Sequence, residues 1–300
     1  MNPTRRNFLK KSAAVLAWAA VSSPLLAAEK TTGVKRNLKK GIMFATIGVP
    51  GSVMEKFKAV KEAGFAGVEP MSHMNQEEVL KARDETGLKI PSVCCSTHWK
   101  ENLASADAAE RERGLNGLKQ TLQDAKKYGA SSVLFIPGIV SKDVSYADAY
   151  TRSQTELRKA VPLAEELGVK IALENVWNNF LLSPLEAARY VDEMKSSAVG
   201  WHFDVGNILR SGWPEQWISV LGNRIQKLHI KEFSRTKMND AGLWKGFEVN
   251  LQEGDNDWSA VMQALDKIHY EGWGIAEQQG ANSPEGLKSI SERMDRIFAL

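Results

Sequence analysis

Residues 170–176 read KIALENV, a short apolar run that ends directly in the carboxylate of Glu174. The run has the composition of a fully buried strand, where a carboxylate is costly unless a partner compensates its charge. Seven further runs of this kind occur between residues 41 and 279, and longer amphipathic stretches separate them. This alternation is typical of a parallel β-sheet covered by helices.

In chain order, the eight candidate strands are GIMFATI (41–47), GVEPMS (67–72), IPSVCCS (90–96), SSVLFIP (131–137), KIALENV (170–176), GWHFDVG (200–206), IQKLHIKEF (225–233) and WGIAEQQ (273–279). Eight strand–helix pairs within about 250 residues match a (β/α)8 barrel in number and size. The competing architecture is a doubly wound open sheet, but GIMFATIGVPGS lacks the spacing of a dinucleotide-binding turn. We therefore predict an α/β fold, a (β/α)8 TIM barrel, as a single domain over residues 41–300.

The N-terminus has the pattern of an export signal. Arg5 and Arg6 precede an apolar stretch, residues 13–28, that is rich in Ala and Ser. Paired arginines in this context are typical of the twin-arginine route, which carries folded proteins across a bacterial inner membrane. A membrane anchor is the alternative, but the stretch is shorter than the roughly 20 residues that span a bilayer. We predict a cleavable signal over residues 1–28, a linker over residues 29–40, a periplasmic location and no stable membrane anchor.

Charge and cysteine content narrow the classes of partner. Residues 1–28 carry four basic and no acidic residues, so their removal lowers the formal charge from +3 to −1. A protein without net positive charge lacks the electrostatic footprint of a nucleic-acid-binding protein. Cys94 and Cys95 are adjacent, too close for an ordinary disulfide, so an exported chain must depend on its apolar core. Nothing in the composition excludes an oligomer.

The last four predicted strands each end near a residue that can bind a metal ion: Glu174 in ALEN, Asp204 in FDVGN, His229 in LHIKE and Glu277 in AEQQ. A lone acid or histidine at a strand end is more often a structural residue. Four in register are different, because active sites of TIM barrels lie at the C-terminal ends of the strands. Carboxylates and imidazole suit one divalent ion such as Mn²⁺, Mg²⁺, Co²⁺ or Zn²⁺. Such an ion would also compensate the charge of Glu174.

Together with EGDNDW (253–258), these motifs resemble the sugar phosphate isomerase/epimerase family of xylose isomerase-like barrels, over nearly all of residues 41–300. The resemblance implies that the four motif residues bind one divalent metal ion. It also implies that the two glutamates, Glu174 and Glu277, are the acid/base pair, as in ketose 3-epimerases. Arg235 falls where those epimerases bind substrate with an arginine, and Asn207 falls where they use a histidine.

Further side chains near the predicted strand ends are candidates for substrate binding. Lys231 follows the histidine of LHIKE by two residues, so it points to the same face at the barrel mouth. There it would meet substrate oxygens or neutralise an acid. Glu69 and His98 also lie near strand ends, with ordinary loop polarity as the alternative. Trp177 and Trp244 offer aromatic faces to a sugar, with plain packing as the alternative.

The sequence predicts a metal-dependent sugar isomerase or epimerase that moves a proton next to a carbonyl through an enediolate. The partner would be an unphosphorylated sugar or glycoside, because no glycine-rich phosphate loop follows the last two strands. A lyase or hydratase that acts on keto-glycosides with the same metal site is one alternative, and a non-catalytic metal- and sugar-binding protein is another. A DNA-repair endonuclease on a related barrel would need more metal ligands and a basic face.

Overall fold

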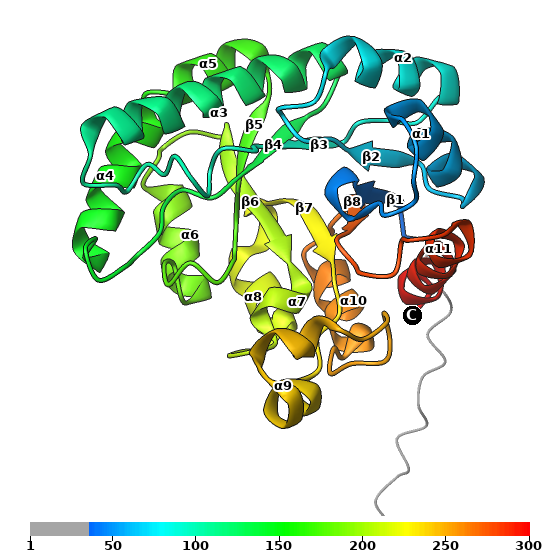
Figure 1. Cartoon of the computed structure of the whole chain (residues 1–300). Coiled ribbons are helices and arrows are strands. Elements are labelled where there is room, and N and C mark those ends of the chain that lie inside the picture. The colour runs from blue at the N-terminus through cyan, green and yellow to red at the C-terminus, as the bar shows by residue number, and fades with distance from the viewer. Residues whose placement is uncertain (1–35) are drawn as a thin grey trace, which may run out of the picture. The chain divides into compact units, whose positions relative to one another are not determined.

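Eight parallel strands form a nearly closed barrel in the computed structural model, which describes residues 36–300 (Figure 1). The strands are β1 (Leu38–Met43), β2 (Gly67–Glu69), β3 (Ser92–Cys94), β4 (Ser132–Phe135), β5 (Lys170–Glu174), β6 (Val199–Asp204), β7 (Ile225–Ile230) and β8 (Gly272–Ala276). They pair in the order β2-β1-β8-β7-β6-β5-β4-β3. Isolated parallel bridges, Gly67–Lys89 and Met71–Cys94, connect the regions of β2 and β3. The predicted TIM barrel is confirmed.

Helices cover the outside of this barrel (Figure 1). They are α1 (Val53–Glu62), α2 (Gln76–Thr86), α3 (Ala108–Tyr128), α4 (Tyr146–Arg158), α5 (Val161–Leu167), α6 (Pro184–Asp192), α7 (Val205–Ile208), α8 (Pro214–Leu221), α9 (Arg235–Ala241), α10 (Trp258–Lys267) and α11 (Pro284–Phe298), with short 3-10 turns η2 (Phe44–Thr46), η3 (Gly222–Arg224) and η4 (Leu243–Phe247). Helix α2 shows how the sequence determines where a helix begins and ends. Asn75 accepts hydrogen bonds from two backbone N–H groups at its start, and Gly87 ends it in the left-handed conformation, with a φ of 69°.

Several strand boundaries differ from the sequence expectation. Strand β1 begins at Leu38, inside the predicted linker, because it pairs with β8 from its first residue. Lys40 in this strand forms an ion pair with Asp295 of α11, with 2.6 Å between Nζ and Oδ2. The predicted runs at 67–72 and 90–96 contain strands of only three residues each. The predicted signal, residues 1–28, lies outside the described residues, and no helix within residues 36–300 has the length and apolarity to cross a membrane.

The barrel interior carries a polar stripe where TIM barrels usually hold branched apolar side chains. Lys227 and His229 lie two residues apart on β7, so they face the same side of the strand, and both are buried. His202 on β6 is buried as well. Lys227 Nζ donates to Ser131 Oγ at 2.8 Å. The strand register places Asp204 beside His229, so the polar stripe continues to the C-terminal end of the barrel.

The connection between β7 and α10 carries α9 and η4 (Figure 1). Glu232, fully buried at its start, accepts hydrogen bonds from the backbone N–H groups of Gln252 (2.8 Å) and Asn256 (3.2 Å) and from Trp258 Nε1 (2.8 Å). One carboxylate thus anchors both ends of a long connection. Two aromatic residues of this connection, Trp244 and Phe247, line the cavity described below.

Candidate metal centre

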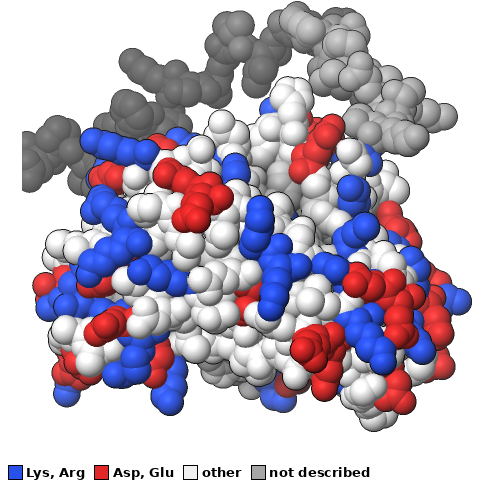
Figure 2. Space-filling view, turned by 90° about the horizontal axis from the view of Figure 1, so that it is seen from above, with Lys and Arg blue, Asp and Glu red and all other residues white. Residues whose placement is uncertain are grey.

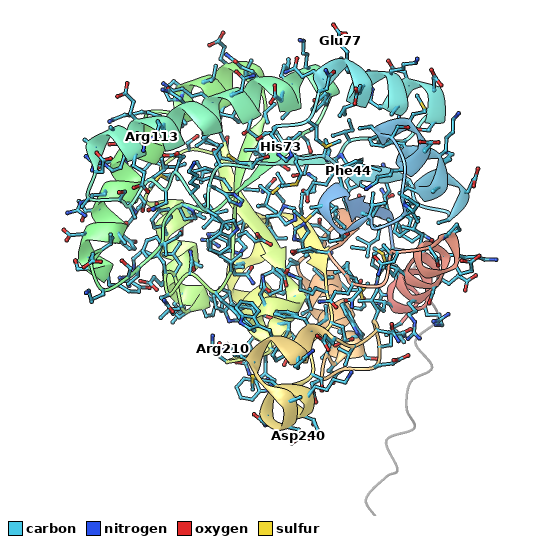
Figure 3. The ribbon with its side chains drawn as sticks, in the orientation of Figure 1. Phe44, His73, Glu77, Arg113, Arg210 and Asp240 are labelled. Carbon is cyan, nitrogen blue, oxygen red and sulfur yellow. The ribbon has the colours of Figure 1, made fainter. Side chains whose placement is uncertain are left out.

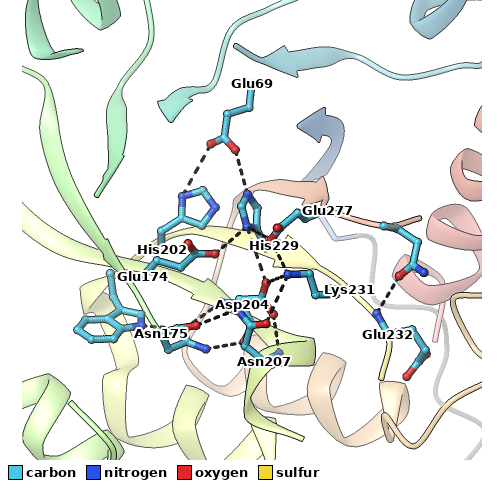
Figure 4. Close-up of polar contacts among 12 residues, drawn as sticks. Glu69, Glu174, Asn175, His202, Asp204, Asn207, His229, Lys231, Glu232 and Glu277 are labelled. Carbon is cyan, nitrogen blue, oxygen red and sulfur yellow. Dashed lines mark hydrogen bonds and ion pairs between the residues drawn. The ribbon is translucent and has the colours of Figure 1, made fainter. Parts of the chain in front are cut away.

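Glu174, Asp204, His229 and Glu277 meet at the C-terminal end of the barrel (Figure 4). Their ligand atoms all lie within 4.8 Å of one another. His229 Nδ1 is 2.9 Å from Glu174 Oε1, 2.9 Å from Glu277 Oε2 and 3.9 Å from Asp204 Oδ2. The backbone explains the convergence, because Asp204 pairs with His229 and the N–H of Glu277 donates to Ile230 O at 3.2 Å. The structure therefore brings together all four residues that the sequence singled out.

The four residues fit a divalent ion by geometry and chemistry. Two ligands that bind one ion at right angles, each at about 2.1 Å, lie about 3 Å apart, which matches the 2.9 Å separations around His229. Asp204 Oδ2 is buried and lies 3.1 Å from Lys231 Nζ, but it makes no hydrogen bond of ordinary geometry, so it keeps acceptor capacity for an ion. Oxygen and imidazole donors together suit Mn²⁺, Co²⁺, Zn²⁺ or Mg²⁺.

Burial and mutual repulsion perturb the acids of this cluster. Burial raises the pKa of Glu174 to about 7 and that of Asp204 to about 6. Burial also acts to raise the pKa of Glu277, but the positive charges of Lys231 and His229 outweigh it and hold that pKa well below its ordinary value. The crowded carboxylates therefore carry negative charge that a proton or a cation must balance.

Lys231 supplies a permanent positive charge at the edge of the cluster. Its Nζ lies 2.8 Å from Glu277 Oε2 and 3.1 Å from Asp204 Oδ2. Burial alone would lower the pKa of Lys231, but these two carboxylates raise it well above the ordinary value. With three carboxylates, one divalent ion and one ammonium group, the site would be electrically neutral. Lys231 also lines the cavity. Its contact with substrate oxygens, which the sequence analysis expected, stays a prediction.

Glu69 lies behind His229, away from the cavity where the sequence analysis expected it to bind substrate. The side chain is fully buried, with Oε2 2.9 Å from His229 Nε2 and Oε1 3.9 Å from His202 Nδ1 (Figure 4). The ring of His202 packs edge-on against that of His229, with 4.2 Å between centroids. With a cation on Nδ1 of His229, Nε2 would carry the ring proton and donate a hydrogen bond to Glu69 Oε2. Glu69 and His202 therefore fix the orientation of a candidate metal ligand.

Replacing Glu69 with glutamine is expected to weaken binding of Mn²⁺ or Co²⁺ about 10-fold to 100-fold, the usual effect of losing such an outer partner. Isothermal titration calorimetry of the metal-stripped protein measures this directly. Glu156→Gln is the matched control, because Glu156 is also a buried acid but pairs with Arg111 and Lys159, away from the cluster. Equal metal affinities in the two variants would show that Glu69 does not orient His229.

Asn175 is a site residue that sequence reasoning missed. Its Oδ1 accepts from the backbone N–H of Asp204 (3.0 Å) and from Trp201 Nε1 (3.1 Å), and its Nδ2 donates to Asp204 O (2.7 Å). One amide thereby connects the end of β5 to the end of β6 and fixes the backbone of two candidate metal ligands. The available signal was its place directly after Glu174, since an amide at a buried strand end needs partners.

A cavity of about 730 Å³ opens above the cluster. Its lining includes Glu174, His229 and Glu277, and further polar and aromatic side chains, among them His98, Asn207, Lys231, Trp99, Trp177, Trp244 and Phe247. Five residues that the sequence proposed for substrate binding thus line the cavity, namely His98, Trp177, Asn207, Lys231 and Trp244. Glu69 and Arg235 are outside the lining.

The hydrogen bonds of three candidate substrate ligands show which of their polar groups are already engaged within the protein. His98 Nδ1 accepts from the N–H of Ile136 at 3.3 Å, and burial lowers the His98 pKa to about 3, so the ring is neutral and carries its proton on Nε2. Asn207 Nδ2 donates to Asn175 O at 3.0 Å, and its Oδ1 lies 3.4 Å from Lys231 Nζ. Arg235 is occupied elsewhere, because its guanidinium donates to two backbone carbonyls, at 2.6 and 2.7 Å.

The family model for xylose isomerase-like TIM barrels matches residues 57–297. The chain belongs to this family. Among curated members, it is 26% identical over 276 residues to the putative L-ribulose-5-phosphate 3-epimerase SgbU of Escherichia coli K12, a match that covers 85% of this chain and 93% of that protein. It is 24% identical over 267 residues to the L-ribulose-5-phosphate 3-epimerase UlaE of Escherichia coli ATCC 8739, covering 82% and 89%. These relatives are sugar epimerases, which are isomerase-class enzymes.

Solved structures of other proteins share the fold. The 3-keto-D-glucoside 4-epimerase YcjR of Escherichia coli superimposes with a TM-score of 0.71 at 19% identity, over 87% of this chain and 98% of that one. The IOLI protein with a bound zinc atom gives a TM-score of 0.69 at 16% identity, over 87% and 98%. At such identities the likeness concerns the fold alone.

Proposed function

We propose that the chain is a divalent-metal-dependent epimerase or isomerase that moves a proton at the carbon next to the carbonyl of an unphosphorylated sugar or glycoside. The observation that carries this proposal is the placement of two glutamates, Glu174 on β5 and Glu277 after β8, each 2.9 Å from the same nitrogen of His229 at the floor of one cavity. Two carboxylates at one reacting carbon are what an epimerisation requires.

The chemistry divides between the ion and the two carboxylates. A divalent ion, when bound, polarises the carbonyl and stabilises the negative charge that develops on its oxygen. One glutamate removes the proton from one face of the carbon, and the other delivers a proton to the opposite face. Their environments push their pKa values apart, that of Glu174 up to about 7 and that of Glu277 down, as befits an acid and a base. In the reverse direction the two exchange roles.

The charges around the cavity support an unphosphorylated substrate. Among the described residues that line it, Lys231 is the one lysine or arginine, and it already pairs with Asp204 and Glu277. The guanidinium of Arg235 is held by backbone carbonyls. A phosphate dianion would therefore meet carboxylates without a free cation.

Free keto sugars and keto-glycosides are accordingly expected to have a kcat/KM at least about tenfold above that of their phosphate esters, a difference of about 1.4 kcal/mol in transition-state stabilisation. Parallel kinetics on matched pairs, such as ribulose and ribulose 5-phosphate, measure the ratio. A clear preference for the phosphate esters would overturn this part of the proposal and assign Lys231 to phosphate binding.

Export from the cytoplasm is part of the same proposal. It rests on the paired arginines Arg5 and Arg6 and the apolar stretch at residues 13–28. A location outside the inner membrane agrees with an unphosphorylated substrate, because sugar phosphates are scarce there. A nucleic acid has no support, since lysine and arginine are interspersed with aspartate and glutamate on the face seen in Figure 2.

Incubation with a panel of keto sugars, keto-glycosides and aldoses, followed by mass spectrometry and chromatography, tests the activity. The panel includes 3-keto-glucosides because a 3-keto-D-glucoside 4-epimerase shares this fold. A new product of unchanged mass is the expected result. A product that has lost one water would instead identify a lyase or dehydratase, in which proton removal is followed by departure of a hydroxyl.

A further inference from the structure

We propose that the cavity contains a second subsite, an aromatic wall formed by Trp177, Trp244 and Phe247, which binds a neutral ring joined to the reacting sugar by a glycosidic bond. The inference rests on the proposed function, because it states what the reacting sugar carries. The ring is a pyranose or an aryl group, since both present an apolar face of C–H or π character.

The aromatic wall is continuous and begins beside the metal centre. The ring of Trp177 lies 5.0 Å from that of Trp244 and 5.0 Å from that of Phe247, with interplanar angles of 40° and 36°. Lys231 connects the wall to the acids, because its Nζ is 5.2 Å from the Phe247 ring centre and 2.8 Å from Glu277. A sugar that reacts between the glutamates therefore has aromatic surface next to it.

Two residues of the aromatic wall, Phe247 and Trp177, are held in place by the surrounding structure. Gly246 packs so closely on Phe233 that a Cβ at this position would lie 2.3 Å from that ring. The N–H of Ser234 donates to Gly246 O at 2.7 Å, and the Phe247 and Phe233 rings are 4.8 Å apart. On the other side, Trp177 Nε1 donates to Asn207 O at 2.9 Å. Because these side chains are already ordered, stacking a ring on them costs little conformational entropy.

Size and exposure indicate that one sugar does not fill the cavity. Its volume of about 730 Å³ lies in the range of pockets for ligands of several rings. A monosaccharide placed at the metal centre would occupy only part of this volume. Trp244 lines the cavity and is 67% exposed, so a ring stacked on it would cover a large apolar surface.

The wall selects against a charged second unit. Its three residues carry no formal charge, and the lysine next to it is paired with carboxylates. Arg210 stacks on Trp177 at 5.0 Å but does not line the cavity, and it lies at the edge of the molecule beside α9 (Figure 3). A neutral ring with an apolar face therefore fits the wall better than a phosphate does.

Calorimetric titration of the Mn²⁺-loaded protein with stable probes tests the subsite without requiring turnover. The probes are methyl β-D-glucopyranoside, phenyl β-D-glucopyranoside and cellobiose. Phenyl glucoside and cellobiose are expected to bind at least about tenfold more tightly than methyl glucoside, a typical effect of one stacked ring. Trp244→Ala should reduce this advantage to about threefold or less. Trp213→Ala is the matched control, because Trp213 is 53% exposed, contacts Arg235 and lies outside the cavity.

Three outcomes would overturn the subsite. The first is equal affinity for the three probes, or no binding by any of them, and the second is an equal loss of affinity in Trp244→Ala and Trp213→Ala. The third is tighter binding of glucose 6-phosphate, titrated as an additional charged probe, than of phenyl glucoside. Failure of the proposed function looks different. In that case phenyl glucoside binds through Trp244, yet no keto sugar or keto-glycoside takes up deuterium from D₂O.

Discussion

Replacing Glu174 or Glu277 with glutamine is expected to lower kcat by about 10²-fold to 10⁴-fold, the contribution of a positioned general acid or base. Glutamine keeps the size of the side chain and a carbonyl oxygen that can still bind a cation, but it cannot accept the proton of a C–H group. The loss should therefore appear in kcat at saturating metal and substrate. Both variants should lose epimerisation activity, because the reaction needs one carboxylate on each face of the carbon.

Deuterium uptake separates the two roles. The parent protein in D₂O should place deuterium on the carbon next to the carbonyl, because a carboxylate that has taken a proton exchanges it with solvent between turnovers. In one Glu→Gln variant the remaining glutamate can still remove and return a proton on its own face. That variant should exchange one epimer without converting it, as nuclear magnetic resonance would show.

Glu156→Gln again serves as the control for loss of a buried acid. Glu156 lies on α4 and pairs with Arg111 on α3 and with Lys159, the residue after α4. It should retain parent kinetics. If the parent binds metal and sugar but takes up no deuterium with any keto sugar, keto-glycoside or aldose, the protein is a binding module and Glu174 is a metal ligand only.

The fold could be predicted because strands buried on both faces leave a strong signal in the sequence. KIALE in β5 and VGWHFD in β6 are nearly uninterrupted apolar runs, and each ends in an acid. In a parallel barrel all such ends lie at one rim, so Glu174, Asp204 and His229 had to converge once the strands were counted. Strand boundaries were less certain, because β2 and β3 are three residues long and their flanking apolar residues pack without extending the ladder.

The depth of Glu69 could not be read from the sequence. Like Glu174 it is the last residue of its strand, and the pattern alone gave both the same place at the rim. Barrel strands are staggered against one another, so equal positions in sequence are not at equal heights. Glu69 reaches the layer of His202, one layer below the candidate metal ligands. Arg235 shows a different limit, because its direction depends on two backbone carbonyls beyond β6 that no local pattern reveals.

The second large effect is expected in metal binding. The parent protein should hold about one divalent ion per chain, and Asp204→Ala or His229→Ala should weaken binding by more than about 100-fold, beyond the effect of an outer partner such as Glu69. Both side chains are fully buried and face the other ligands, so their removal leaves a gap that water fills poorly. Elemental analysis of the purified protein gives the stoichiometry. Variants that bind as much metal as the parent would place the site elsewhere.

The pH dependence of metal binding follows from the same acids. Burial raises the pKa of Glu174 to about 7 and that of Asp204 to about 6, so below these values protons compete with the ion for the ligand oxygens. Affinity should therefore rise from about pH 5 to about pH 8. Burial would lower the pKa of His229, but the neighbouring carboxylates outweigh it and raise that pKa well above the ordinary value. His229 therefore carries a proton in the metal-free cluster, so binding should release protons throughout this range. Titration calorimetry in two buffers of different ionisation enthalpy counts those protons. An affinity that is constant across the range would mean that the ion does not bind to Glu174 and Asp204, and the acid/base pair would then lose the cation that makes it effective.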